Sequence, residues 1–221
     1  MKMKWGVAMV GLVLLGILMP RRAPASLAAK TTGWINIFPL PSFKAWTRVA
    51  IPPDRALNPK SQWSVDAAHH TIVCAGNGGH EWLRYDRELG DFMFHVDWRL
   101  TRVEGAKNYN SGVFVRNSAD GRTWYQAQVG SASGGYLFGD NPVNGKLVRF
   151  NLESMLTGNR VKKAGDWNTY DIRCQGSKIT VVVNGTKTSE FERCANPKGY
   201  LGLEAEGSRM EFRNLRIKIL P

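Results

Sequence analysis

The stretch from Gly90 to Asp140 constrains the fold more than any other part of this sequence. It contains three runs that alternate between apolar and other residues with the period of two that β-strands impose: GDFMFHVDWRL, SGVFVRN and TWYQAQVGS. Alternation over this many residues predicts strands with one buried face and one face left for other contacts.

The non-core face of these runs carries an unusual set of side chains. In the first run the residues opposite the apolar ones are His95, Asp97 and Arg99, and in the third they are Trp124, Gln126 and Gln128. A sheet built from the three runs would have an apolar back and a front rich in Arg, Gln, Asp, His and Trp. Such a front favours a polar, ring-shaped ligand such as a sugar.

The rest of the chain favours an all-β fold. A hairpin is predicted over residues 61–76, and further strands over 34–38, 81–86, 166–175, 178–184, 200–206 and 209–220. Asn184-Gly185 between two β-branched runs is a hairpin-turn signal. About ten to twelve short strands separated by turns predict a two-sheet β-sandwich of the concanavalin-like jelly-roll type.

Two segments lack the strand pattern. Residues 39–59 are rich in Pro and read as a loop, and residues 141–165 read as a long irregular excursion. No repeat, low-complexity tract or linker divides residues 30–221, which we therefore expect to form one domain.

The first residues are expected to lie outside that domain. Lys2 and Lys4 precede an apolar run that is followed by small residues around Ala25, the order of a signal peptide. Residues 1–28 are thus predicted to direct export to the periplasm or the outside of a bacterial cell, and an uncleaved anchor is the alternative. No other segment of the sequence is expected to span a membrane.

Charge and cysteine content narrow the classes of partner. The formal net charge is +12, of which four charges lie in the predicted leader. The remaining basic residues are scattered singly, which argues against a nucleic-acid partner. Cys74, Cys174 and Cys194 lack the CxxC spacing of a zinc site, and one pair among them could oxidise after export.

Several phrases in a fixed order resemble the 3-keto-disaccharide hydrolase domain family, an exported bacterial family with a concanavalin-like jelly-roll fold. The phrases span nearly all of residues 33–220 and are WINIF from Trp34, EWLR from Glu81, GDF from Gly90, DWR from Asp97, NSGVFVR from Asn110, WNTYDI from Trp167 and EFRNLRI from Glu211. One departure is that Gln126 stands two residues before Gln128, where the family often has Glu.

The resemblance implies a substrate whose sugar carries a ketone at C3. The ketone acidifies the C2 proton, so the bond at C1 breaks by elimination and water then adds. This route needs a base, a positive group or metal near the enolate oxygen, and an acid for the leaving group. A site with Arg, Gln, Asn and His but few carboxylates suits it better than the two-carboxylate route of ordinary glycosidases.

The candidate catalytic residues are His80, Glu81 and Arg116. The first two follow a glycine-rich loop and are the candidate base or metal ligands. Arg116 ends an apolar strand and is expected to share a face with Phe114, where it could bind an enolate, or it could instead pair with Asp91 or Asp97. A divalent metal is left open, and no other cofactor is indicated.

The candidate carbohydrate-binding residues are Arg99, Asn110, Trp124, Gln126, Gln128 and Asp140. Gln126 and Gln128 lie two apart on a strand and reach the same face, although a solvated outer sheet face would look the same. Trp124 could stack on a sugar ring or pack in the core. The alternatives to an enzyme are a non-catalytic carbohydrate-binding module of the same fold and a structural domain of the bacterial envelope.

Overall fold

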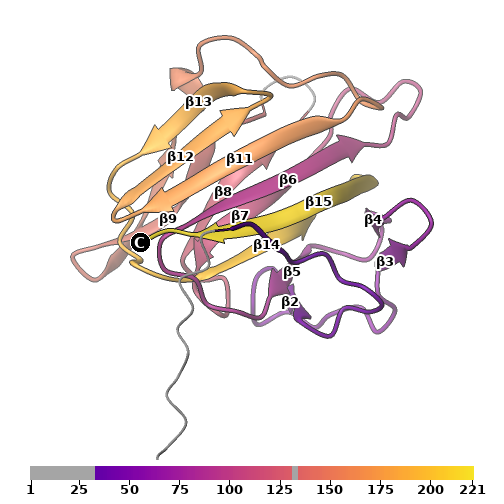
Figure 1. The fold of residues 1–221 in the computed structure, drawn as a ribbon, viewed down its shortest axis with the longest axis horizontal. Coiled ribbons are helices and arrows are strands. Elements are labelled where there is room, and N and C mark those ends of the chain that lie inside the picture. Colours follow the sequence, from indigo (N-terminus) through magenta and orange to yellow (C-terminus); the bar gives the residue numbers. More distant parts are fainter. Residues whose placement is uncertain (1–32, 131–133) are drawn as a thin grey trace, which may run out of the picture.

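The computed structural model describes residues 33–130 and 134–221, and these form two antiparallel β-sheets packed face to face (Figure 1). This is the jelly-roll sandwich that the strand pattern predicts. The predicted leader, residues 1–28, lies outside the described residues. Within the described part of the chain, no helix is long and apolar enough to cross a membrane.

The first sheet, sheet A, has the strand order β13-β12-β11-β6-β15-β4-β3, and β1 pairs with β15 beside this path. Its strands are β1 (Ile35–Asn36), β3 (Trp63–Asp66), β4 (Thr71–Cys74), β6 (Phe92–Leu100), β11 (Asn168–Gln175), β12 (Lys178–Val183), β13 (Thr186–Phe191) and β15 (Met210–Ile219).

The second sheet, sheet B, has the strand order β10-β9-β8-β7-β14-β5-β2 and lies behind sheet A in Figure 1. Its strands are β2 (Trp46–Ala50), β5 (Glu81–Tyr85), β7 (Ser111–Asn117), β8 (Trp124–Val129), β9 (Leu137–Val143), β10 (Lys146–Asn151) and β14 (Tyr200–Ala205). One short 3₁₀ helix, η1 (Glu153–Met155), follows β10.

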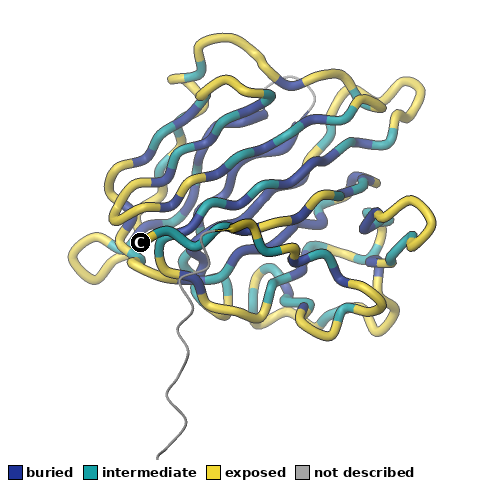
Figure 2. The backbone as a smooth tube through the Cα atoms, in the orientation of Figure 1, coloured by how far each residue is buried: buried dark blue, intermediate teal, exposed yellow. Residues whose placement is uncertain are grey.

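The core lies between the two sheets, and the alternating runs build it. The five alternating apolar residues of β6, from Phe92 to Leu100, are each at most 1% exposed, as are Val113 and Val115 of β7 and Tyr125 and Ala127 of β8. Figure 2 shows the same pattern, with buried segments along the strands and exposed segments at the turns. Burying each such large apolar side chain contributes about 1.5–3 kcal/mol.

The three runs of residues 90–140 do not share one sheet, and this corrects the sequence-based expectation. Strand β6 lies in sheet A, whereas β7 and β8 lie in sheet B. The segment 101–110 carries the chain across one end of the sandwich between β6 and β7. The polar residues of β6 therefore face away from those of β8, on the opposite outer surface of the molecule.

The two segments predicted to be irregular both contain strands. Residues 39–59 include the edge strand β2, and residues 137–151 form the hairpin β9–β10. The turn of that hairpin is Asn144-Gly145, with φ of 49° and 75°. Asn184-Gly185 has the same sequence signal, and the turn predicted there is confirmed, with φ of 48° and 83°. The hairpin matters for the site because β10 supplies Arg149.

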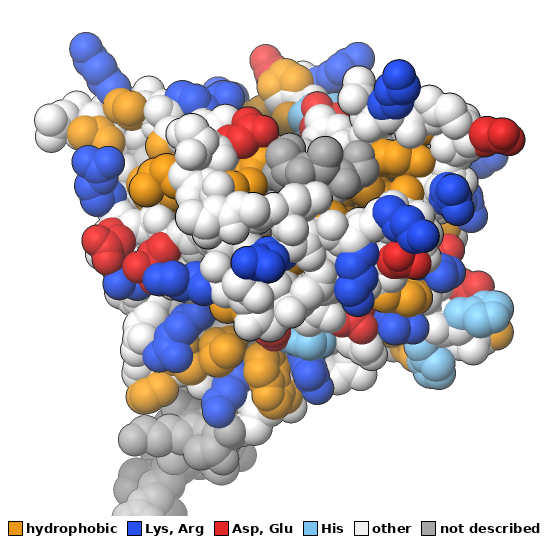
Figure 3. All heavy atoms as spheres, turned by 90° about the horizontal axis from the view of Figure 1, so that it is seen from above, with side chains coloured by type: hydrophobic (Ala, Val, Ile, Leu, Met, Phe, Trp, Pro, Cys, Tyr) orange, Lys and Arg blue, Asp and Glu red, His pale blue; other side chains and the backbone are white. Residues whose placement is uncertain are grey.

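Lys and Arg side chains are mixed with other types on the face drawn in Figure 3, rather than gathered into one patch. This arrangement agrees with the scattered basic residues of the sequence. Much of the charge is locally paired, as in the ion pairs Arg84–Asp86 and Lys178–Glu192.

Candidate functional site

A cavity of about 330 Å³ lies on the outer face of sheet B, the face opposite the core. Its lining combines aromatic and polar side chains from six strands and the loops beside them: Ile51, His80, Trp82, Phe114, Asn117, Gly121, Trp124, Gln126, Phe138, Arg149, Glu204 and Glu206. A hollow with an apolar wall and a few converging polar groups is the usual form of a small-ligand site.

The polar groups form one continuous hydrogen-bonded chain. Gln128 Nε2 donates to Asn110 Oδ1 at 2.7 Å, and Gln126 Nε2 donates to Gln128 Oε1 at 3.0 Å. Gln126 Nε2 also donates to Glu204 Oε2 at 2.8 Å, and the other Glu204 oxygen lies 2.8 Å from His80 Nε2. The chain links four predicted site residues through Glu204, which the sequence reasoning missed.

Gly112 makes this chain possible. It lies on β7, between β8 and β14, and a Cβ atom there would lie 2.2 Å from Gln126 Nε2. Because Gly112 has no side chain, the Gln126 amide crosses over β7 and reaches Glu204 on the far strand. The Ser111 hydroxyl donates to the backbone carbonyl of Glu204 at 2.8 Å and fixes the strand there.

Glu204 is the buried carboxylate of the cavity, and only 2% of it is exposed. Burial raises the pKa of its carboxyl, against the hydrogen bond from His80, and the charge of Glu206 adds to the increase. For His80, burial alone lowers the pKa, but the hydrogen bond to Glu204 and the charges of Glu204 and Glu206 outweigh it, so the pKa is raised. Both shifts favour the protonated form of the pair.

A signal for Glu204 and Glu206 was present in the sequence. In the predicted strand 200–206, Leu201, Leu203 and Ala205 alternate with the two glutamates, and the structure buries all three of these apolar residues in the core. The two carboxylates thus face outward, next to His80, which directly precedes the neighbouring strand β5.

Aromatic side chains form the other wall. Trp124 meets Phe114 and Phe138 edge to face at centroid distances of 6.2 and 5.0 Å. Its indole Nε1 donates to Asp140 Oδ2 at 3.0 Å, and the Arg149 guanidinium lies 4.9 Å from its ring centroid. Asp140 also pairs with Arg149. Asp140 therefore supports the wall from strand β9.

Glu81 does not line this cavity. Its carboxylate accepts hydrogen bonds from Arg48 Nε and Nη2 at 2.9 and 2.7 Å, and from Gln62 Nε2 at 2.9 Å. Strand alternation explains the difference, because Trp82 faces the cavity and Glu81 therefore points the other way. Glu81 joins β2, β5 and the segment before β3.

Arg116 also lies elsewhere, and the expectation that it shares a face with Phe114 is wrong. Two residues of β7 oppose one residue of β14 at this point, and Arg116 has φ of 55°, so a β-bulge turns its side chain inward. Arg116 is fully buried and pairs with Asp91 at 2.8 Å, which confirms the alternative prediction. Asn117 takes the place on the cavity wall.

Arg99 lies on the outer face of sheet A, on the far side of the sandwich. It pairs with Glu211 at 2.6 Å and lies 4.7 Å over the ring of Trp167. His95 and Asp97 are on the same face, where His95 pairs with Asp171 at 2.7 Å. These residues belong to a polar network on sheet A and do not contribute to the cavity of sheet B.

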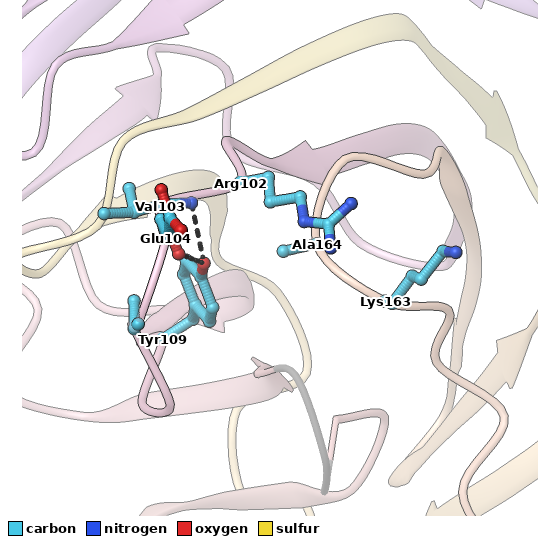
Figure 4. Close-up of a pocket in the computed structure, with 8 residues that line it drawn as sticks. Arg102, Val103, Glu104, Tyr109, Lys163 and Ala164 are labelled. Carbon is cyan, nitrogen blue, oxygen red and sulfur yellow. Dashed lines mark hydrogen bonds between the residues drawn. The ribbon is translucent and has the colours of Figure 1, made fainter.

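A larger hollow of about 640 Å³ lies between the loop 102–109 and Lys163 and Ala164, as Figure 4 shows. The Tyr109 hydroxyl accepts a hydrogen bond from the Val103 backbone at 3.0 Å and closes this loop on itself. Glu104 is its one carboxylate among the described lining residues. It lacks the aromatic wall and the converging polar chain of the sheet B cavity.

The two-sheet fold, with a cavity on the outer face of sheet B, defines a protein of the jelly-roll class. The chain belongs to the family of 3-keto-alpha-glucoside-1,2-lyase-like domains, whose match covers residues 33–218. No curated protein matches the sequence.

Solved structures share the fold at low sequence identity. A protein from Parabacteroides distasonis named as a candidate glycosyl hydrolase has 18% identity and a TM-score of 0.58, covering 87% of this chain and 96% of its own. A carbohydrate binding module from Bacillus subtilis has 14% identity and a TM-score of 0.55, covering 77% and 93%. A beta-glucanase from Bacillus licheniformis has 13% identity and a TM-score of 0.50, covering 80% and 92%.

Proposed function

We propose that this protein is exported and cleaves 3-keto-glycosides in the cavity of sheet B, by removal of the C2 proton, elimination at C1 and hydration. The observation that supports the proposal most is the hydrogen-bonded chain that ends in the buried Glu204–His80 pair, 2.8 Å apart, at the floor of an aromatic cavity. Membership of the family agrees with it.

The chemistry requires proton transfer more than charge stabilisation at C1. A base takes the proton from C2, and the electron pair forms the C1=C2 double bond as the bond from C1 to the leaving oxygen breaks. The leaving oxygen takes a proton, and water then adds across the double bond to give the free 3-keto sugar. Groups that accept and return protons within one cavity can serve each of these steps.

His80, Glu204 and Glu206 are the proton-transfer groups of the cavity in this proposal. The side chain of Glu206 is 37% exposed, so its carboxylate is open to a bound ligand, whereas the 3% exposed Glu204 acts on His80. Arg149, which lines the cavity from β10 and is paired with Asp140, is the cationic hydrogen-bond donor that could contact an anionic intermediate. Trp124 and Phe138 provide an apolar surface for a sugar ring.

The ordinary glycosidase route fits this cavity less well. That route places two carboxyl groups on opposite sides of the scissile bond. Here Glu204 and Glu206 lie on one side with His80, and both oxygens of Glu204 already have hydrogen-bond partners. The remaining carboxylate at the wall, Asp140, is paired with Arg149 and Trp124.

The test is to incubate the purified protein with 3-keto-trehalose or 3-keto-sucrose and to measure released sugar, with and without divalent metal. Solvent deuterium should appear at C2 of the recovered 3-keto sugar, because elimination and hydration exchange that position. Unoxidised trehalose is the matched control and should remain intact. Absence of release from both oxidised substrates, with and without metal, would contradict the proposal.

A non-catalytic carbohydrate-binding module is the second candidate function. Gln126 favours it, because an amide cannot transfer a proton at neutral pH as the carboxylate that the family often has could do. Calorimetry that shows glycan binding by the wild-type protein, together with no product and no deuterium exchange at C2, would decide for this function.

A further inference from the structure

Three side chains at the floor of the sheet B cavity are arranged as ligands for a metal ion. His80 Nε2 lies 2.8 Å from Glu204 Oε1 and 3.9 Å from Glu206 Oε2, and the three ligand atoms are all within 4.8 Å of one another. Two ligand atoms bound to one ion at about 2.1 Å lie roughly 3.0–3.4 Å apart. Small side-chain rotations would therefore bring the three atoms to one ion.

The charge of the cluster is the second reason. Glu81, Asp97 and Glu204 are the buried carboxylates of the described residues. Glu81 pairs with Arg48 and Asp97 pairs with Arg213, so each of these carboxylates has a permanently charged partner. Glu204 has only His80. Glu206 adds another negative charge beside it. A buried carboxylate without a full cation is costly, and a bound cation supplies what the arginines supply elsewhere.

The protein holds these groups in place through a second layer of contacts. Gln126 Nε2 donates to Glu204 Oε2, which leaves Oε1 directed toward His80. Strands β5 and β14 are paired, with Glu204 opposite Trp82 and Ala205 opposite Glu81. His80 directly precedes β5 and Glu206 directly follows β14, so both residues flank the same end of this strand pair. Outer-layer hydrogen bonds of this kind orient ligands at metal sites.

The cavity next to the cluster also has an unused hydrogen-bond donor. Trp82 is fully buried, its Nε1 has no partner among the described residues, and a Cβ on Gly121 would lie 3.1 Å from that nitrogen. Trp82 and Gly121 both line the cavity. A buried donor without a partner indicates a ligand or water that accepts from it.

We propose that His80, Glu204 and Glu206 bind one divalent transition-metal ion, through the imidazole nitrogen and one oxygen of each carboxylate. One nitrogen and two oxygen ligands suit Mn²⁺, Fe²⁺ or Zn²⁺ better than Mg²⁺, which prefers oxygen. Three protein ligands leave positions open toward the cavity, as in metal sites that act on a ligand. When the ion is bound, His80 and Glu204 act as its ligands in place of the proton-transfer roles proposed above, and the second oxygen of Glu206 remains available for proton transfer.

The site is tested with the protein alone, so its outcome is separate from that of the lyase reaction. Chelator-treated full-length protein is titrated with Mn²⁺, with electron paramagnetic resonance used to count free ions. We expect one saturable site per chain, weakened at least about tenfold in Glu206→Gln and in His80→Ala. Glu206→Gln changes a half-exposed side chain and is the variant expected to fold normally.

His69→Ala is the matched control, because His69 pairs with Asp66 at 2.8 Å on the exposed surface and is not one of the residues lining the cavity. It should bind Mn²⁺ like the wild-type protein. The proposal is overturned if the wild-type protein shows no saturable site at millimolar Mn²⁺, or if Glu206→Gln binds as tightly as wild type.

Discussion

Gln126 on β8 and Glu204 on β14 are hydrogen-bonded at 2.8 Å although strand β7 separates them in the sheet. Neighbouring strands in a sheet lie about 4.8 Å apart, so residues two strands apart meet only when the strand between them offers no side chain. Gly112 provides that gap. The gap makes Gln126 a positioning residue for Glu204.

Gly112→Ala should therefore disable the cavity more than it destabilises the fold. The new Cβ would lie 2.2 Å from Gln126 Nε2, so the amide must leave and its bonds to Glu204 and Gln128 are lost. We expect the free energy of unfolding measured in urea to fall by about 1–3 kcal/mol. The loss of glycan binding or turnover should be larger than this destabilisation alone would cause. Gly90→Ala, where a Cβ meets nothing within 4 Å, should change neither.

Gln126→Glu restores the carboxylate that the family often has and places it beside Glu204. In the wild-type protein Gln126 donates a hydrogen bond to Glu204 at 2.8 Å, whereas in the metal-free variant two carboxylates repel each other at this place. The midpoint of thermal unfolding should therefore fall. Added Mn²⁺ should raise the midpoint more in this variant than in wild type. An equal Mn²⁺ effect in both proteins would contradict the expected gain of a cation-binding charge.

Arg116→Ala is expected to be a stability variant and not a site variant. Its removal leaves Asp91 and the carbonyl groups of Gly176 and Asn196 without their buried partner. The cost should be about 3–5 kcal/mol in the free energy of unfolding. Ligand affinity per folded molecule should be unchanged. Arg122→Ala, at an exposed pair with Asp120, should cost less than about 1 kcal/mol.

Two tryptophans distinguish the two outer faces of the sandwich. Trp124 lines the cavity of sheet B, whereas Trp167 lies 4.7 Å from Arg99 and 4.0 Å from Arg213 on sheet A. Trp124→Ala should weaken carbohydrate binding in calorimetry by about 0.5–1.5 kcal/mol, and Trp167→Ala should leave it unchanged. The opposite result would move the ligand to sheet A.

The three cysteines should be unreactive in the folded protein. Burial raises the pKa of Cys74 to about 12 and raises the pKa of Cys174 and Cys194 as well. Because the thiolate is the reactive form, a raised pKa means that little of it exists at pH 8. A thiol reagent should label none of the three at pH 8 without denaturant and all three in guanidinium. Fewer labelled thiols after unfolding would indicate an oxidised pair.

Strand periodicity predicted the fold correctly because the core faces of the strands are mostly apolar. The same periodicity identified Gln126, Gln128 and Trp124 on one face, and that placement is confirmed. It could not assign β6 and β8 to different sheets, since alternation within a strand carries no information on its neighbours. Arg99 was therefore grouped with residues on the opposite side of the molecule.

Local backbone geometry explains the other differences. A strictly alternating β7 would place Arg116 beside Phe114, but one extra residue at the bulge reverses the direction. Glu204 was missed because the alternation of its strand resembles that of any strand with one outer face. Its role depends on the hydrogen bond with His80, which lies 124 positions earlier in the sequence. Only the pairing of β14 with β5 brings the two together.

Because β14 lies between β5 and β7, the cavity of sheet B cannot form until β14 has been synthesised. During synthesis β5 and β7 are completed long before β14, and no earlier strand takes the place between them. Sheet A has the same property, since β15 lies between β6 and β4. Folding must wait until nearly the whole chain has emerged, as expected for a topology dominated by distant pairings. If the protein is exported as proposed, this strand order would delay closure of both sheets until after the chain could be threaded through a secretion pore.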